Sequence, residues 1–397
     1  MFFDERVGLM KQLLRSMTLL VFVSMLMACG GVPAPAAIPD VTAGPPPSAT
    51  EAPGATSDGV DKTKLAAELH VYNWTDYIDP ALLTAFETEY GVKVIVDNYD
   101  QNEDMIAKVR AGGSGYDIVV PSDYAVEIMW RAELLQELDK SMLTNIVHNE
   151  PTLLNKYFDE GNKYSVPYMY GITGIAYNKK TFPTAPDSWS TLFDVANAEK
   201  YQGQFSMLDD EREVPGSALR YLGYSLNETD PAAMQKIQEL LIAQKPFLAA
   251  YNSSDVNRKL SSGEYVMAQA WSGQAMQARN GLGDEFAGNP DIGFVIPKEG
   301  GMIWMDNMTI LKDSPNAYTA HVFMNYMMRP EVAAQNTSYI GYLPPNKDAI
   351  PLMDQTVRDL YAEGFSPDAE VMKRLEWAVR NETTAVFSDV WTAVKGE

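Results

Sequence analysis

The sequence predicts an α/β fold built on a largely parallel sheet. Strand-like and helix-like segments alternate along the chain, and the connections between strands are long enough to be helices. This alternation is typical of parallel strands joined by crossover helices. The chain has 397 residues, of which 46% are hydrophobic, which is enough for two domains with cores of their own.

The first strand and helix are marked by the stretch YNWTDYIDP at 72–80. Leu69 and Val71 alternate with polar or aromatic neighbours, as in a half-buried strand. Asp79 is a favourable N-cap and Pro80 a favourable first helical residue, so a helix is expected to start there. The loop between the two elements then carries Trp74, Thr75, Asp76 and Tyr77.

The following segments repeat this arrangement. GVKVIVDNYD predicts a second strand, DQNEDMIAKVRAG a helix that ends at Gly112, and YDIVVPSDYAVEIM a short buried strand, a loop and a helix. In parallel sheets, ligands bind beyond the carboxyl ends of the strands. The segments NWTDY and PSDY, the second with Ser122 and Tyr124, are therefore expected to share one edge of the sheet.

A second unit begins near GITGIAYNKKTF and continues with a strand at GQFSML, an acidic loop at DDEREVPGSALR and a helix over 231–249. YVMAQAWSGQAM predicts a strand, a loop and a helix, and an amphipathic helix is expected over 371–394. Four strand ends are thus expected to carry an aromatic or acidic residue: Trp74 with Asp76, Asp210 with Glu213, Trp271, and Trp304 with Asp306.

The aromatic and acidic residues at these strand ends have competing interpretations. The polar surroundings of Trp74 favour a binding site over a core position. Taken alone, Asp210 and Glu213 fit a solvated charge run paired with Arg212 better than a site. Asp306 lies in an apolar stretch with no basic residue nearby in sequence, so it is either paired or functional.

Composition excludes several functional classes. A formal charge of −22, from 53 acidic and 31 basic residues, argues against binding of nucleic acid. The only histidines, His70, His148 and His321, lie in no nucleophile or metal motif, and structural roles are favoured for them. The sequence therefore predicts neither an enzyme nor a metal or other cofactor.

The N-terminal segment predicts export and a lipid anchor. Basic residues precede an apolar run over 17–28, which is too short to span a bilayer. The run ends in LMAC, similar to the bacterial lipobox, in which the cysteine, here Cys29, is acylated; an ordinary signal peptide is the alternative. A Pro-, Ala- and Gly-rich tether follows. We therefore expect a signal peptide over 1–28 and a tether over 29–64.

Several stretches, taken in order, resemble the spermidine/putrescine-binding proteins of bacterial ABC importers. These stretches are YNWTDYIDP, YDIVVPSDY, YSVPYMYGITGIAYN, LDDEREV, GGMIWMDNM and YIGYLPPN. The resemblance covers about residues 65–397. It implies a two-lobed type II periplasmic-binding-protein fold with the ligand in a cleft between the lobes. Lobe 1 would comprise 65–171 and 303–350, and lobe 2 would comprise 172–302 and 351–397.

The resemblance also implies the ligand and the residues that hold it. The expected protein is an extracytoplasmic, lipid-anchored protein that delivers a polyamine, with spermidine favoured over putrescine, to importer permease subunits. In that family aromatic rings hold the methylene chain and acids hold the ammonium groups. The matching residues are the aromatics Trp74, Tyr77, Tyr124, Trp271, Trp304 and Tyr342, the acids Asp76, Asp210, Glu213 and Asp306, and the neighbours Thr75 and Ser122.

The chain departs from the family pattern at three positions. Ala378 stands where spermidine binders often carry a glutamine, Gln274 where some putrescine specialists carry an acid, and Asp76 where a spermidine binder has the longer glutamate. These departures concern ligand choice. An alternative function is a membrane-tethered sensor of polyamines or another cationic small molecule that does not take part in transport.

Overall fold

The computed structural model describes residues 59–379 and 385–396. The expected signal peptide, Cys29 and most of the expected tether lie outside the described residues. Residues Gly59–Glu397 form one compact unit. Val60 and Leu65 pack against its core, and the backbone N–H of Asp61 donates to the hydroxyl of Tyr318 over 2.8 Å, so the packed chain includes a few residues before 65.

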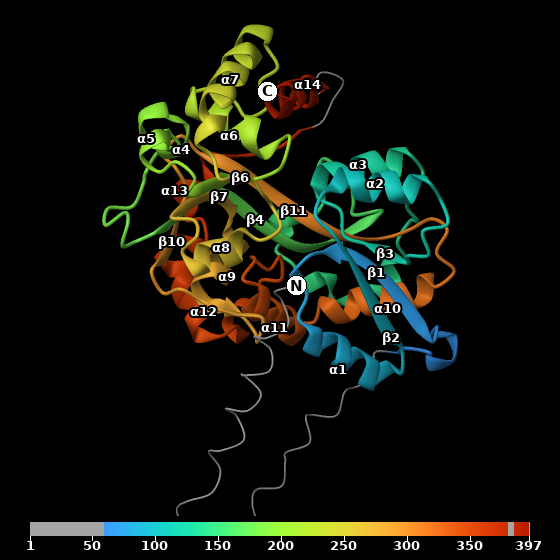
Figure 1. The fold of residues 1–397 in the computed structure, drawn as a ribbon. Coiled ribbons are helices and arrows are strands. Elements are labelled where there is room, and N and C mark those ends of the chain that lie inside the picture. The colour runs from blue at the N-terminus through green and yellow to red at the C-terminus, as the bar shows by residue number, and fades with distance from the viewer. Residues whose placement is uncertain (1–58, 380–384, 397) are drawn as a thin grey trace, which may run out of the picture. The chain divides into compact units, whose positions relative to one another are not determined.

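A mixed ten-stranded sheet runs through this unit in the order β2-β1-β3-β11-β4-β7-β5-β6, with β10 beside β4 and β12 beside β11 (Figure 1). The strands are β1 (Glu68–Trp74), β2 (Lys93–Tyr99), β3 (Ile118–Val119), β4 (Ser165–Asn178), β5 (Phe205–Met207), β6 (Ala250–Tyr251), β7 (Met267–Trp271), β10 (Ile292–Val295), β11 (Gly301–Ile310) and β12 (Leu375–Trp377). The short strands β8 (Gly281–Leu282) and β9 (Phe286–Ala287) pair separately.

The strand directions confirm the α/β class but correct one detail. β1 pairs in parallel with β2 and β3, and β5 pairs in parallel with β6 and β7. The long strands β4 and β11 run antiparallel to each other, and they also run antiparallel to β7 and β3, respectively. The sheet is therefore mixed rather than largely parallel, because two antiparallel strands join two parallel groups.

β4 and β11 connect the two groups of parallel strands. β4 pairs with β11 from Ser165 to Ile172 and with β7 from Thr173 to Tyr177. In Figure 1 both strands pass between the group containing β1 and the group containing β7. This arrangement is that of a two-lobed α/β protein, while the residue limits of the lobes stay a prediction.

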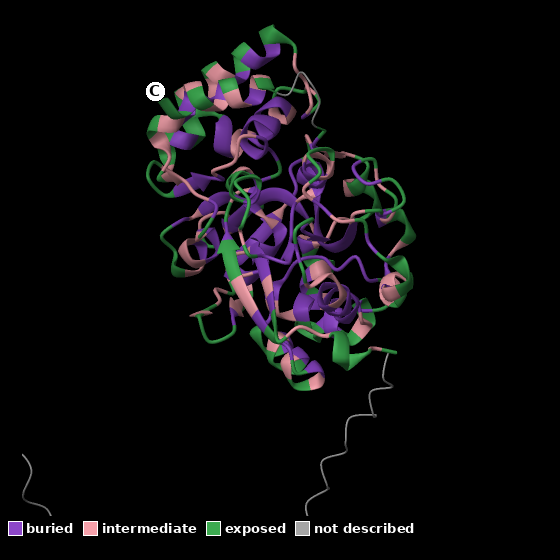
Figure 2. Ribbon diagram, turned by 90° about the vertical axis from the view of Figure 1, so that its right-hand side faces the viewer, coloured by how far each residue is buried: buried purple, intermediate pink, exposed green. Residues whose placement is uncertain are grey.

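Helices cover the sheet. They are α1 (Pro80–Tyr90), α2 (Asn102–Arg110), α3 (Asp123–Arg131), α4 (Ser190–Phe193), α5 (Val195–Lys200), α6 (Glu213–Tyr221), α7 (Pro231–Gln244), α8 (Val256–Ser262), α9 (Ser272–Asn280), α10 (Ala317–Met327), α11 (Pro330–Ile340), α12 (Gln355–Leu360), α13 (Ala369–Met372) and α14 (Ala385–Gly396). Figure 2 shows buried residues concentrated at the sheet and the inner helix faces. Among the described residues, none of the helices combines the length and apolarity needed to cross a bilayer.

The start of α1 follows the sequence prediction. The side chain of Asp79 accepts a hydrogen bond from the backbone N–H of Ala81, and Pro80 is the first helical residue. Leu82, Phe86 and Tyr90 are buried on one face, the spacing that packs an amphipathic helix against a core. The loop before α1 is therefore fixed at both ends, by β1 and by this cap.

Two local predictions are wrong. The expected helix over 371–394 is instead the short helix α13, the strand β12 and the separate helix α14. Leu375–Trp377 pairs in parallel with Gly301–Ile303, so pairing with a distant strand overrides the local helical pattern. The expected acidic loop at DDEREVPGSALR is largely helix, since α6 begins at Glu213.

Candidate functional site

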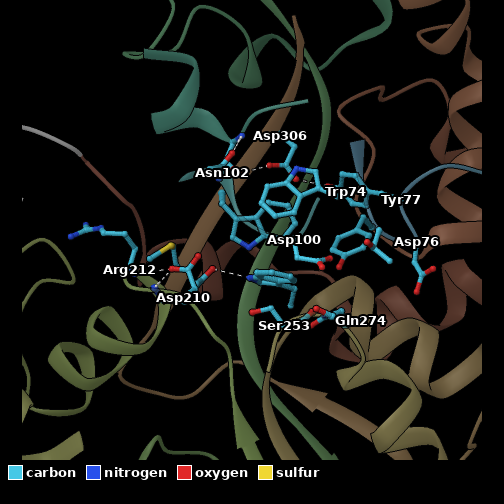
Figure 3. Close-up of a pocket in the computed structure, with 18 of the residues that line it drawn as sticks. Trp74, Asp76, Tyr77, Asp100, Asn102, Asp210, Arg212, Ser253, Gln274 and Asp306 are labelled. Carbon is cyan, nitrogen blue, oxygen red and sulfur yellow. Dashed lines mark hydrogen bonds between the residues drawn. The ribbon is translucent and has the colours of Figure 1, made fainter. Parts of the chain in front are cut away.

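One pocket collects every candidate ligand-binding residue. The empty space between its lining atoms, including the part open to solvent, is about 810 Å³, and Figure 3 shows side chains from several elements converging on it. The lining residues are Trp74, Thr75, Asp76, Tyr77, Asp100, Asn102, Ser122, Asp123, Tyr124, Asp210, Arg212, Glu213, Ser253, Ser254, Asn257, Trp271, Gln274, Gln277, Met302, Trp304, Asp306, Tyr342 and Ala378.

Asp306 lies in the middle of β11, not at a strand end as expected. The register of β11 against β4 shifts between Asp306 and Asn307. The carboxylate of Asp306 accepts hydrogen bonds from the Tyr77 hydroxyl over 2.7 Å and from the Ser122 hydroxyl over 2.6 Å. Burial raises the pKa of Asp306 to about 7. The side chain therefore presents a poorly solvated carboxyl group, held by two hydroxyls, to the pocket.

A second acidic cluster surrounds the start of α6. Glu213 accepts hydrogen bonds from the Thr173 hydroxyl and the Trp271 indole N–H, each over 2.9 Å. Its second carboxylate oxygen, Oε2, is buried and has no hydrogen-bond partner among the described residues. Burial and, secondarily, the neighbouring Asp210 raise the pKa of Glu213 to about 8. Asp210 accepts the backbone N–H groups of Arg212 and Glu213 over 2.7 and 2.9 Å.

The structure overturns the interpretation of this segment as a solvated charge run. Only 2% of Arg212 and 4% of Glu213 are exposed. The guanidinium of Arg212 donates to the Asn227 side chain over 2.9 Å and lies 3.7 Å from the ring centre of Phe387. Tertiary packing buries Arg212 and Glu213. A buried acid must be either protonated or paired with a positive group.

Aromatic rings form a continuous row beside the acids. Trp74 meets Trp271 edge-on with ring centres 6.3 Å apart, Trp271 meets Trp304 edge-on at 6.2 Å, and Trp304 lies 5.6 Å from Tyr342. Tyr342 in turn meets Tyr77 edge-on at 4.8 Å. These rings supply the apolar faces of the pocket.

Two glycines allow the rings to lie this close to the backbone. A Cβ atom on Gly171 of β4 would lie 2.4 Å from the Trp304 ring, and one on Gly273 of α9 would lie 2.3 Å from the Tyr342 ring. Both distances are far below van der Waals contact. Any larger residue at either position would push an aromatic ring out of place.

Asp76 has a cationic partner in the structure. It follows β1, has a backbone φ of 55°, and lines the pocket. Its carboxylate accepts a hydrogen bond from Nη1 of Arg258 in α8 over 2.6 Å. The sequence interpretation of Asp76 as an ammonium site did not foresee this ion pair.

Sequence reasoning missed several lining residues. Asp123 is buried within the quoted PSDY segment, and burial raises its pKa to about 7. Asp100 directly follows β2, so the strand-end rule could have identified it. Asn102 donates to the Ser122 hydroxyl over 3.0 Å, and Gln277 lies one helical turn beyond Gln274 on α9. No local signal marks Ser253, Ser254, Arg212 or Asn257 as lining residues.

Gln274 and Ala378, two of the three positions where the chain departs from the family pattern, both line the pocket. The amide N–H of Gln274 donates to the backbone carbonyl of Ser253 over 2.6 Å. Its carbonyl oxygen is buried without a hydrogen-bond partner among the described residues, so Gln274 offers the pocket an acceptor rather than a charge.

The arrangement is suited to a cationic ligand with an apolar body. Six carboxyl groups line the pocket, against one guanidinium, that of Arg212. None of the three histidines is among the lining residues. In the described part of the chain, no group of three or more His, Cys, Asp or Glu residues could hold a metal ion. Carboxyl groups beside indole faces bind ammonium groups by charge-assisted hydrogen bonds and cation–π contacts.

Comparison with known families agrees with this chemistry. Residues 81–361 match the family model described as bacterial extracellular solute-binding protein. The spermidine/putrescine-binding periplasmic protein of Escherichia coli K12 is 40% identical over 81% of this chain and 88% of its own length. A putrescine/cadaverine-binding protein of Pseudomonas aeruginosa is 36% identical over 85% of this chain and 96% of its own length.

A solved structure shows the same fold. A candidate spermidine/putrescine ABC transporter protein from Listeria monocytogenes is 37% identical, with a TM-score of 0.75, over 83% of this chain and 99% of that chain. The similarity spans nearly the whole of that solved chain rather than one lobe of it.

Proposed function

The chain belongs to the family of bacterial extracellular solute-binding proteins, and on that basis we propose that it captures a polyamine outside the cytoplasm and delivers it to an ABC importer. Proteins of this family bind solutes and are not enzymes. The observation that carries the proposal is the pocket, in which the carboxyl groups of Asp306 and Glu213 lie beside a row of aromatic rings.

The pocket has partners for both parts of a polyamine, its methylene chain and its protonated nitrogens. A polyamine is a flexible methylene chain with protonated nitrogens. The rings of Trp74, Trp271 and Trp304 cover methylenes and attract ammonium groups, at about 0.5–2 kcal/mol per cation–π contact. The carboxyl groups of Asp306 and Glu213 accept charge-assisted hydrogen bonds worth about 1.5–3 kcal/mol each. The spacing of these acids then selects the spacing of the nitrogens.

The proposed lobes place this pocket in a cleft. With lobe 1 as 65–171 plus 303–350 and lobe 2 as 172–302 plus 351–397, Asp306 belongs to lobe 1 and Glu213 to lobe 2. The change of partner in β4 at residues 172–173 supports this division. A polycation bound to acids of both lobes stabilises the closed arrangement over an open one.

We expect spermidine to bind about tenfold more tightly than putrescine. Asp210, Glu213 and Asp306 all line the pocket, and a diamine has too few nitrogens to meet three carboxyl groups. One additional charge-assisted hydrogen bond of about 1.5 kcal/mol corresponds to about tenfold in affinity. Calorimetric titration of the soluble protein from residue 59 onward with both ligands measures the ratio.

A diamine of the same length as spermidine tests whether the middle nitrogen causes the preference for spermidine over putrescine. 1,8-Diaminooctane has the chain length of spermidine but lacks the middle nitrogen, so it should bind nearer to putrescine than to spermidine. Putrescine binding as tightly as spermidine would contradict the rank while leaving polyamine capture intact. Failure of every polyamine to bind would contradict the proposed function. Permease and ATPase genes beside this one would favour import over the alternative sensor role.

We also propose that the protein is attached to the membrane by a lipid on Cys29. The support is the LMAC sequence at 26–29 after a basic and apolar segment. Cells fed radioactive palmitate are expected to label the wild-type protein and not the Cys29→Ser variant. An unlabelled wild-type protein that retains its N-terminal segment would contradict the anchor.

A further inference from the structure

An ion pair lies at the Asp76 end of the pocket. Nη1 and Nη2 of Arg258 lie 2.6 and 3.5 Å from the two carboxylate oxygens of Asp76. Nη2 of Arg258 also donates to Glu285, and the guanidinium lies 5.1 Å from the ring centre of Phe286. The guanidinium is thus held by two carboxylates and an aromatic face, rather than by Asp76 alone.

The backbone of Asp76 is fixed as well. The amide N–H of Gln277 donates to the Asp76 carbonyl over 3.2 Å and to the Ile340 carbonyl over 2.9 Å. The amide of Asn257 donates to Gln277 over 2.6 Å and to the Asp76 carboxylate over 3.4 Å. Asp76, Asn257 and Gln277 all line the pocket. This polar network forms its end wall, and Figure 3 shows Asp76 at the opposite end from Asp210 and Arg212.

Arg258 occupies the Asp76 carboxylate. The Asp76 side chain is only 13% exposed, so water screens its interaction with Arg258 less than it would at the surface. An arginine stays charged at physiological pH and offers a planar fork of donors. A ligand ammonium would have to displace this fork, and the displaced guanidinium would lose one of its two carboxylate partners.

We propose that Arg258 is a specificity-determining residue that removes Asp76 from the set of ammonium sites and so limits how many positive charges the pocket accepts. This inference rests on the proposed polyamine function. With Arg258 present, the Asp76 carboxylate is already paired with a guanidinium, which disfavours binding of a further ligand nitrogen there. Without it, Asp76 becomes an additional, partly buried acid at the end of the same pocket, and a longer ligand with one more ammonium gains a partner.

Substitution of Arg258 tests this assignment. Calorimetry with spermidine and spermine, a tetraamine, should show that Arg258→Gln raises the spermine-to-spermidine affinity ratio about tenfold, the value of one charge-assisted hydrogen bond. Arg258→Lys keeps a positive charge beside Asp76 and should keep the wild-type ratio. The double variant Asp76→Asn with Arg258→Gln should lose the gain. Arg131→Gln, which removes an exposed ion-paired arginine outside the pocket lining, should not alter the ratio.

The outcomes separate this inference from the proposed function. If the wild-type protein binds polyamines but Arg258→Gln leaves the ratio unchanged, with its thermal melting intact, Arg258 does not determine specificity. If the wild-type protein binds no polyamine, the proposed function fails and this inference fails with it. Arg258→Met, which keeps the apolar stem beside Phe286, gives the same test if the glutamine variant does not fold.

Discussion

Replacement of Asp306 by asparagine is expected to weaken spermidine binding by about thirtyfold or more. The carboxylate of Asp306 is 4% exposed and accepts hydrogen bonds from Tyr77 and Ser122. An ammonium bound there forms a buried charge pair, and removal of one partner of such a pair costs about 2 kcal/mol or more, which is about thirtyfold in affinity. Calorimetric titration of the variant with spermidine measures the loss.

The Asp306→Asn variant removes the negative charge of the side chain while keeping its shape. Its side-chain carbonyl still accepts a hydrogen bond from either hydroxyl, so the fold around β11 should persist, as a thermal melt would show. Asp313→Asn makes the same charge change at an exposed position outside the pocket lining and should leave affinity unaltered. A loss of less than threefold in a folded Asp306→Asn protein would mean that Asp306 serves structure alone.

Replacement of Glu213 by glutamine is expected to weaken spermidine binding by a similar factor, about thirtyfold, and to flatten its pH dependence. Oε1 of Glu213 accepts from Thr173 and Trp271, while Oε2 is the buried oxygen without a partner in the described chain. In the glutamine variant the amide oxygen still accepts hydrogen bonds from Thr173 and Trp271, so the amide N–H₂ group takes the position of Oε2. That group cannot accept from an ammonium, and a bond worth about 2 kcal/mol is lost.

The pH dependence has a definite sign. Burial raises the pKa of Glu213 to about 8 and the pKa of Asp306 to about 7, so near neutral pH both acids hold protons part of the time. A bound polycation favours the ionised forms and releases these protons. Affinity should therefore rise as the pH increases from about 6 to about 8, because fewer protons remain to be displaced.

Two measurements check this sign. Calorimetry in buffers of different ionisation enthalpy should count protons released on binding, with fewer released by Glu213→Gln than by the wild type. The ligand-free protein should also lose stability as the pH rises through 7 to 8, because its folded state holds protons that the unfolded state has already lost. Glu239→Gln, on the exposed side of α7, is the control. A spermidine affinity that stays constant between pH 6 and 8 would contradict partial protonation of Glu213 and Asp306.

The sequence alone determined much of the local structure and identified candidate residues that come together in one pocket. The Asp79 cap and Pro80 define the start of α1, and alternation defines β1, because both signals lie within a few residues of chain. Strand ends of an α/β sheet meet at one edge, so the motifs that follow strands could be assigned to a shared pocket before the fold was known. All the candidate ligand-binding residues line that pocket.

Only the tertiary structure decided how those residues are used. Asp76 pairs with Arg258, which is far along the chain and in no motif with it. Trp304 and Asp306 lie within β11 because that strand continues to pair with β4, and β12 replaces a predicted helix because it pairs with β11. Such pairings satisfy backbone and charged groups through contacts between distant residues. Local propensity carries no information about those contacts, so only the fold determines which acids have cationic partners.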